Sequence, residues 1–159
     1  MLKRVLLPLT VGLAVFATPS PSARQDETDN WKTALGWNGT YTPPEKVGDN
    51  MTDGLNLAQP FGGVYFCQDI EWQGNCGYSV LQCYNCIELR REWSEMISSM
   101  SPDPGTDVVI YEGPNCQNIG GAASEAARLS YPGVSDFRTI PPGTWNDNTR
   151  SFMVRPAGH

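Results

Sequence analysis

Histidine is almost absent from this chain of 159 residues: the single copy, His159, is the last residue. Serine triads, cysteine–histidine dyads and most zinc sites need an internal imidazole, so the composition argues against those active sites. Lysine is scarce too, because only Lys32 and Lys46 follow Lys3. With 17 acidic against 11 basic residues the net charge is −6, and nucleic acids and anionic membranes need a basic face that so acidic a chain lacks.

Long hydrophobic runs are missing except at the N-terminus. Residues 5–17 form an apolar run interrupted by Pro8 and Thr10, preceded by the basic pair at positions 3 and 4. The run is too short to span a bilayer comfortably, and its proportions are those of a secretory signal. We predict a signal peptide over residues 1–17, with cleavage after Ala23 as the alternative. The product is expected to be secreted and extracellular, without a membrane span.

The cysteines and the glycosylation sequons fit that compartment. Five cysteines in a secreted chain predict two disulfides and one unpaired thiol, with the pairing left open among Cys67, Cys76, Cys83, Cys86 and Cys116. Cys83 and Cys86 have C-x-x-C spacing. A redox site would also need a helix N-terminus in a βαβ context, and a zinc site a second C-x-x-C or histidines, and neither is present. Asn38 and Asn50 each begin an acceptor sequon for N-glycosylation.

Composition divides the remaining chain into an arm, a compact unit and a tail. Residues 24–61 are rich in Asp, Asn, Gly, Thr and Pro and show no periodicity, which predicts a poorly ordered or loosely attached arm carrying both sequons. Strand-like sequence begins at residue 62, and 16 Gly with 13 Pro favour a turn-rich fold over long helices. We place the compact unit at 62–155 and a frayed tail at 156–159.

A pattern repeats inside the compact unit. Phe66 and Ile110, 44 positions apart (66 to 110), each open a six-residue corner rich in Gly, Pro or Asx. Trp93 and Trp145, 52 positions apart (93 to 145), each begin a polar stretch that ends in Ser. Two offsets in the same order indicate a duplicated β motif with a short insertion in the second copy.

One segment permits two interpretations. Apolar residues recur at helical spacing at Leu89, Trp93, Met96, Ile97 and Met100, which predicts a short amphipathic helix around 88–96. The repeat instead predicts a short strand, a helical turn and another strand over the same residues. The sequence leaves both open.

The compact unit resembles the βγ-crystallins and the cysteine-rich fungal secreted proteins that share their fold. Residues 64–76 (VYFCQDIEWQGNC) are similar to that family's opening hairpin, and 83–89 (CYNCIEL) with Ser98-Ser99 fall where it places its third and fourth strands. Residues 107–116 (DVVIYEGPNC) resemble the start of a second Greek key. The resemblance implies an all-β fold, two Greek-key motifs packed as a β-sandwich, with Trp93 and Trp145 in the core.

The chain departs from the family pattern in its cysteines. Cys116 replaces the aromatic residue of the second corner, and the number of cysteines is odd. In fungal relatives the resemblance leads us to expect cysteines near Val108 and Val154. Valine at both positions indicates a bridge lost as a pair.

The resemblance also implies calcium binding through one six-residue stretch per Greek key, since each family site combines the front of one stretch with the hydroxyl of the other. The stretches here are 94–99 (SEMISS) and 146–151 (NDNTRS). One pairing gives a single weak site, formed by Asn146, Asp147, the Asn148 carbonyl and Ser98. The other would face Arg150, whose guanidinium repels a cation. The alternative is that these residues only stabilise turns. No cofactor is expected beyond this calcium.

No catalytic machinery is predicted. The carboxylate pairs 69 with 71 and 92 with 95 are interpreted as solvated charge, because no nucleophile–base arrangement accompanies them. We therefore expect a monomeric, non-catalytic extracellular protein with a binding, structural or effector role and a protein or glycan partner of unknown identity. The alternative is a proteinase inhibitor or killer-toxin-like antimicrobial protein acting through exposed loops, with 102–105 and 120–131 as the candidates.

Overall fold

A computed structural model describes residues 31–49, 58–118, 126–141 and 145–158. The expected signal peptide over 1–17, the alternative cleavage site at Ala23 and the sequon at Asn50 lie outside these ranges. Within them, no helix has both the length and the apolar character needed to cross a membrane.

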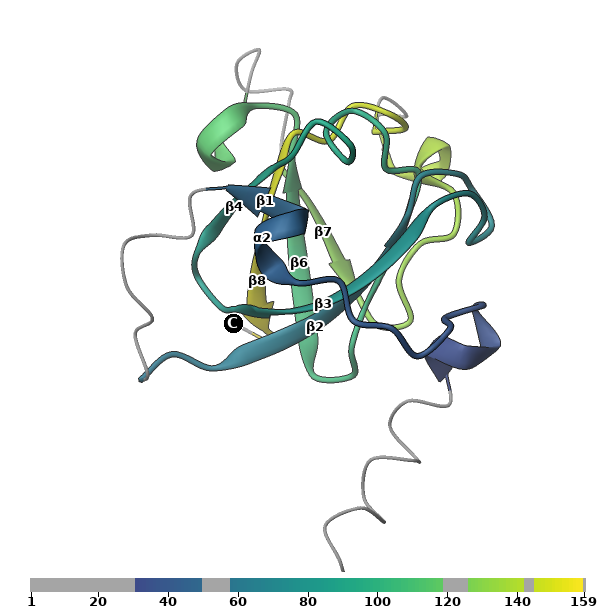
Figure 1. The fold of residues 1–159 in the computed structure, drawn as a ribbon. Coiled ribbons are helices and arrows are strands. Elements are labelled where there is room, and N and C mark those ends of the chain that lie inside the picture. Colours follow the sequence, from purple (N-terminus) through teal and green to yellow (C-terminus); the bar gives the residue numbers. More distant parts are fainter. Residues whose placement is uncertain (1–30, 50–57, 119–125, 142–144, 159) are drawn as a thin grey trace, which may run out of the picture. The chain divides into compact units, whose positions relative to one another are not determined.

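Two antiparallel sheets form the fold (Figure 1). The smaller sheet has the order β3-β2-β5, with bounds Cys76–Gln82, Phe61–Cys67 and Ser99–Pro102. The larger has the order β1-β4-β8-β6-β7, with bounds Gly48–Asp49, Cys86–Leu89, Ser151–Pro156, Thr106–Tyr111 and Ala127–Ser130. Helices α2 (Pro44–Val47), η2 (Pro114–Cys116) and η3 (Phe137–Thr139) are single turns, and residues 31–34 are also helical.

The two halves of the unit exchange strands. β4 belongs to the first half but pairs in the larger sheet with β8 of the second, where Ile87 faces Phe152. In return, Val134 of the second half forms a β-bridge with Met100 of β5 in the smaller sheet. Each sheet therefore contains chain from both halves. This arrangement confirms the all-β sandwich of two Greek keys.

The backbone repeats with the spacing that the sequence predicts. Positive φ angles occur in pairs at the two corners, at Glu71 (54°) and Trp72 (60°) and again at Asn115 (55°) and Cys116 (54°). A positive φ angle also recurs 52 positions apart, at Glu95 (59°) in the first key and Asp147 (55°) in the second. This region of φ costs a non-glycine residue about 1–2 kcal/mol. Its recurrence at matching positions shows that the topology, rather than the local residue type, imposes it.

The amphipathic helix predicted around 88–96 does not form, and the alternative prediction from the repeat is confirmed. β4 continues to Leu89, which pairs with Gly48 of β1, so the start of the expected helix is already in a sheet. Residues 91–96 form turns, and β5 begins at Ser99. Sheet pairing thus overrides the helical periodicity.

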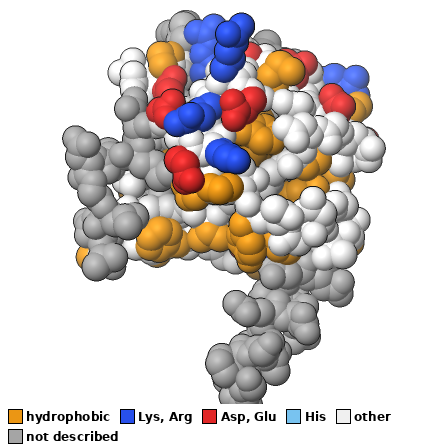
Figure 2. Space-filling model, viewed as in Figure 1, with side chains coloured by type: hydrophobic (Ala, Val, Ile, Leu, Met, Phe, Trp, Pro, Cys, Tyr) orange, Lys and Arg blue, Asp and Glu red, His pale blue; other side chains and the backbone are white. Residues whose placement is uncertain are grey.

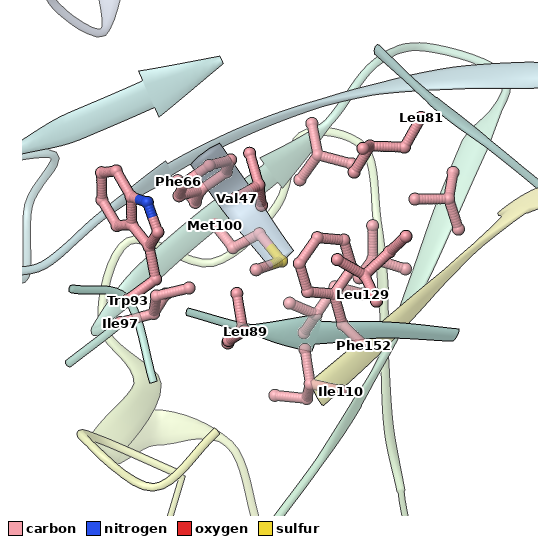
Figure 3. Packing of buried hydrophobic residues seen from close by; sticks show 14 of the residues in the cluster. Val47, Phe66, Leu81, Leu89, Trp93, Ile97, Met100, Ile110, Leu129 and Phe152 are labelled. Carbon is pink, nitrogen blue, oxygen red and sulfur yellow. The ribbon is translucent and has the colours of Figure 1, made fainter. Parts of the chain in front are cut away.

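The apolar residues of that segment are nevertheless buried. Trp93 is 4% exposed, packs edge-on against Phe66 with ring centroids 4.8 Å apart, and donates its Nε1–H to the Lys46 carbonyl at 3.1 Å. Figure 3 shows Trp93 and Ile97 beside Phe66 and Met100 in the core between the sheets. Trp145 is 1% exposed, so both tryptophans lie in the core as expected.

Two disulfides and one buried thiol confirm the expected number of bridges. Cys67 pairs with Cys76, and Cys86 of β4 pairs with Cys116 of η2, which joins the two keys. Burial raises the pKa of the free Cys83 thiol, so it stays protonated and unreactive. The positions of the expected lost bridge, Val108 and Val154, are opposite each other on β6 and β8 and fully buried.

The arm packs more closely than its composition leads us to expect. Over residues 31–49, Lys32 is 2% exposed and Val47 is fully buried in the main core. β1 adds an edge strand to β4, while Trp37 and Tyr41 contact the ring of Tyr78. A loosely attached arm is therefore the wrong description for these residues, because their scattered aromatic side chains find partners only in the folded protein.

Asp107 makes the fold sensitive to acid. It is buried on β6 and accepts a hydrogen bond from Arg128 Nε at 2.9 Å. Burial alone would raise the pKa of Asp107, but hydrogen bonds from Ser130 and Arg128 and the charge of Arg128 outweigh it and hold that pKa below its usual value. Because the folded pKa is lower than the unfolded one, this stabilisation is present above the unfolded value, about 4, and is lost as the pH falls through the folded pKa.

We expect Asp107→Asn to flatten the fall in the free energy of unfolding between about pH 5 and pH 2, measured by urea titration. Asp49→Asn is the matched control, since that carboxylate is mostly exposed and pairs with Arg90 at the surface. An acid slope in Asp107→Asn as steep as in the unsubstituted protein would contradict this account.

Candidate functional site

The strand exchange brings the two six-residue stretches side by side. Residues 94–99 run into β5, and 146–151 run into β8. Backbone hydrogen bonds join them in both directions, from Asp147 N to the Ile97 carbonyl (3.4 Å) and from Glu95 N to the Thr149 carbonyl (2.9 Å). Each stretch thus contributes its first residues to one cluster and its fifth residue to another. We call these clusters clamps: the first contains Asn146, Asp147 and Ser98, and the second contains Glu95 and Arg150.

In the first clamp the predicted side chains meet. Ser98 Oγ donates to Asp147 Oδ1 at 2.9 Å, and Asn146 Nδ2 donates to Asp147 Oδ2 at 2.7 Å. Asn146 Oδ1 is buried without a hydrogen-bond partner among the described residues. Asn148 lies in the same turn, with its N–H donating to the Trp145 carbonyl at 3.2 Å. This is a set of oxygen atoms drawn from both keys.

The second clamp is closed by an ion pair. Arg150 donates through Nε and Nη2 to Glu95 Oε1, at 3.0 and 2.7 Å. Because about half of each side chain is exposed, the pair adds little stability. Its consequence is electrostatic, since the guanidinium neutralises the carboxylate that a cation would need.

The chemistry of the first clamp fits a hard cation, but a weakly held one. Calcium takes six to eight oxygen ligands, and the clamp offers a carboxylate, an amide oxygen, a hydroxyl and main-chain carbonyls. The unpartnered Asn146 Oδ1 suits a ligand position. Across the described ranges, no group of three or more His, Cys, Asp or Glu comes together, so the clamp contains little negative charge.

A buried lysine forms a second cluster that the sequence did not reveal. The Lys32 Nζ lies 3.7 Å from the centroid of the Tyr78 ring, 4.9 Å from that of Trp37 and 3.7 Å from Asp103 Oδ1. Tyr78 Oη donates to Asp103 Oδ2 at 2.6 Å. The only hint in the sequence was the scarcity of lysine, because a lysine among polar residues normally indicates a solvated surface.

Two of the four carboxylates considered for catalysis have side-chain partners. Glu71 Oε1 accepts a hydrogen bond from Ser135 Oγ at 3.0 Å, and Glu95 pairs with Arg150. The candidate inhibitor loop at 102–105 is also fastened, because Asp103 N donates to the Gly63 carbonyl at 2.9 Å and its side chain binds Tyr78. In the other candidate loop, 120–131, residues 120–125 lie outside the described residues.

Three observations identify the fold. The two corners have matching backbone angles, each sheet contains chain from both halves, and the stretches 94–99 and 146–151 are hydrogen-bonded to each other. It is a βγ-crystallin-like fold. No protein-family model matches the sequence, and no curated protein is similar enough in sequence to count as a relative.

Solved structures with similar backbones are βγ-crystallin domains. One from Flavobacterium johnsoniae is 21% identical, with a TM-score of 0.47, and the match covers 60% of this chain and 97% of that one. The Ca²⁺-bound domain of Abundant Perithecial Protein from Neurospora crassa is 11% identical, with a TM-score of 0.45, covering 60% and 90%. A double mutant of a Clostridium beijerinckii domain is 21% identical, with a TM-score of 0.40, covering 58% and 94%. Similarity at this level carries no information about what the chain binds.

Proposed function

We propose that this chain is a secreted, non-catalytic binding or structural protein, held by two disulfides and stabilised by one weak calcium site. The difference between the two clamps carries the proposal: Ser98, Asp147 and Asn146 offer oxygen atoms with one left unpartnered, whereas Glu95 and Arg150 neutralise each other. The disulfides support an oxidising compartment. The sequon at Asn38 supports glycosylation, since that side chain is exposed.

Calcium would be held by Asn146, Asp147, the Asn148 carbonyl and Ser98. A divalent cation there supplies charge for the Asp147 carboxylate and a partner for the buried Asn146 oxygen. Because Ser98 precedes β5 and the other three precede β8, the ion would connect the two keys. Its effect is therefore expected on stability rather than on chemistry.

Calcium is expected to raise the melting temperature by several degrees. Extracellular calcium modules bind at about 10⁻⁴–10⁻³ M, so about 5 mM calcium adds roughly 1–2.3 kcal/mol to the free energy of unfolding. In a domain of this size that corresponds to several degrees. The measurement compares melting in calcium with melting in chelator.

Two variants make this experiment specific. Asp147→Ala removes the carboxylate of the open clamp and is expected to abolish the calcium shift. Glu95→Ala removes the carboxylate at the equivalent position of the closed clamp and should leave the shift intact. No shift in the unsubstituted protein, or an equal shift in Asp147→Ala, would contradict the calcium site.

The inhibitor or toxin function remains the alternative proposal. It requires an exposed loop free to enter a partner, and the fastened turn at 102–105 does not favour it. A tight complex with a protease, or growth arrest by the purified protein, would be the evidence in its favour.

A further inference from the structure

A pocket of about 330 Å³ lies between the arm and the corner that joins β2 to β3. Three aromatic side chains line it, Trp37, Tyr65 and Trp72, together with the amide side chains of Asn38, Gln73 and Asn75. None of the nine described residues that line it is charged, although the chain has 17 acidic and 11 basic residues. Figure 2 shows charged side chains gathered over β1 and β4 and few at the lower right of this view.

This lining has the chemistry that recognises a neutral sugar. The partly exposed Trp72 ring lies beside the buried Tyr65 ring, with centroids 6.3 Å apart and planes tilted by 31°, and the exposed part of Trp72 can pack against the C–H groups of a pyranose ring. Carboxamides both donate and accept hydrogen bonds, as sugar hydroxyl groups require. The accessible lining of the pocket is mostly polar, which suits a ligand rich in hydroxyl groups, and the lack of charge among the described lining residues disfavours an ionic ligand.

Both walls of the pocket are fixed before any ligand arrives. The Cys67–Cys76 disulfide closes the corner that contributes residues 72–76. On the arm side, Lys32 is held by the Tyr78 ring and Asp103, and Trp37 Nε1 donates to the Thr40 carbonyl at 2.9 Å. Such preorganisation reduces the entropy lost on binding.

The second Greek key shows that the fold does not require this pocket. Its corner has the same pair of positive φ angles, but the position of Trp72 is taken by Cys116, which is tied to Cys86. A bulky residue at φ 60° is unfavourable, so a tryptophan there has no local conformational advantage. The aromatic wall is thus a feature of the first corner alone.

We propose that this pocket binds one neutral pyranose residue. The proposal rests on the extracellular binding role proposed above and adds the ligand class and the site. The sugar has two candidate sources: a glycan of another molecule, or the chain's own N-glycan, because Asn38 lines the pocket and begins a sequon with Thr40.

The test uses full-length mature protein carrying Thr40→Ala, which cannot be glycosylated at Asn38 but keeps the asparagine. It is titrated with chitotetraose, mannotetraose and laminaritetraose while the tryptophan indole N–H resonances are followed by NMR. At least one oligosaccharide is expected to saturate and to shift the Trp37 or Trp72 signal. Trp72→Gly, which suits the positive φ, should weaken that binding at least about tenfold.

Asn75→Ala is expected to weaken binding without disturbing the aromatic wall. Phe61→Ala is the matched control, since it removes an exposed aromatic ring outside the pocket lining and should change nothing. Absence of saturable binding to all three oligosaccharides, or equal affinity in Trp72→Gly, would overturn the proposal. The calcium melting shift of the same protein tests the proposed function separately, so failure of one is distinguishable from failure of the other.

A second arm compares glycosylated protein with an intact sequon. If the chain's own glycan fills the pocket, the indole signals are already shifted, and removing that glycan with an endoglycosidase returns the response to added sugar. If the indole signals of the glycosylated protein match those of Thr40→Ala, and both proteins bind the added oligosaccharide with the same affinity, the pocket binds glycans of other molecules. Either result supports a pyranose site and identifies its source.

Discussion

Asp103→Ala is expected to lower the free energy of unfolding by about 3 kcal/mol, measured by urea titration. Removing this carboxylate takes away the negative charge that lies 3.7 Å from the ammonium of Lys32, a side chain that is only 2% exposed. Breaking a buried pair costs about 3–5 kcal/mol, and the lower end applies because Asp103 is 26% exposed.

A double variant separates the effect of the charge pair from general damage. Lys32→Met with Asp103→Asn removes both charges while keeping the two side chains at similar size. It is expected to recover most of the stability lost in Asp103→Ala, because both charges of the Lys32–Asp103 pair are removed together. A loss below about 0.5 kcal/mol in Asp103→Ala, as for an exposed pair, would show that Lys32 does not anchor the arm.

Removing the Cys86–Cys116 disulfide should cost more than removing Cys67–Cys76. The first spans 30 residues and the second spans 9. The entropy of closing those loops in the unfolded chain corresponds to about 3–4 kcal/mol for the longer and about 2–3 kcal/mol for the shorter. Double cysteine-to-alanine variants of each pair, compared by urea titration at one pH, give the two values.

Cys83→Ala is the control for the loss of a cysteine as such. Its thiol is buried and unpaired, so the substitution leaves a small cavity, which should cost about 1 kcal/mol. A larger loss for the short loop than for the long one would contradict the entropic order. A loss below about 1 kcal/mol for both would show that the core alone stabilises the fold.

The Greek-key corners could be predicted because the same short corner occurs twice in the chain at a fixed spacing. A chain that folds back within six residues needs special backbone angles at fixed positions, and the duplicated motif repeats that need. The 44-residue spacing of Phe66 and Ile110 therefore also separates the positive φ angles of Glu71 and Trp72 from those of Asn115 and Cys116. The helix around 88–96 failed for the complementary reason, because long-range pairing of β4 with β8 decided the conformation there.

The residues of the two clamps could also be predicted before the structure was known, whereas the packing of the arm could not. The resemblance to the βγ-crystallins implied that Asn146, Asp147 and Ser98 come together, and the structure places them in contact. Lys32 and the pocket depend on contacts between residues 31–49 and side chains of β2 and β3, such as Tyr65 and Tyr78. No periodicity marks such contacts, since the arm contributes single side chains rather than a regular face.

The number of calcium ions bound per chain tests the central claim most directly, since the two clamps are proposed to differ. Calorimetric titration of chelator-treated protein is predicted to give one ion per chain, with a dissociation constant of about 10⁻⁴–10⁻³ M, and none in Asp147→Ala. Two ions would show that the Glu95–Arg150 pair does not close its clamp. No binding would show that Ser98, Asn146 and Asp147 serve only to hold the two turns together.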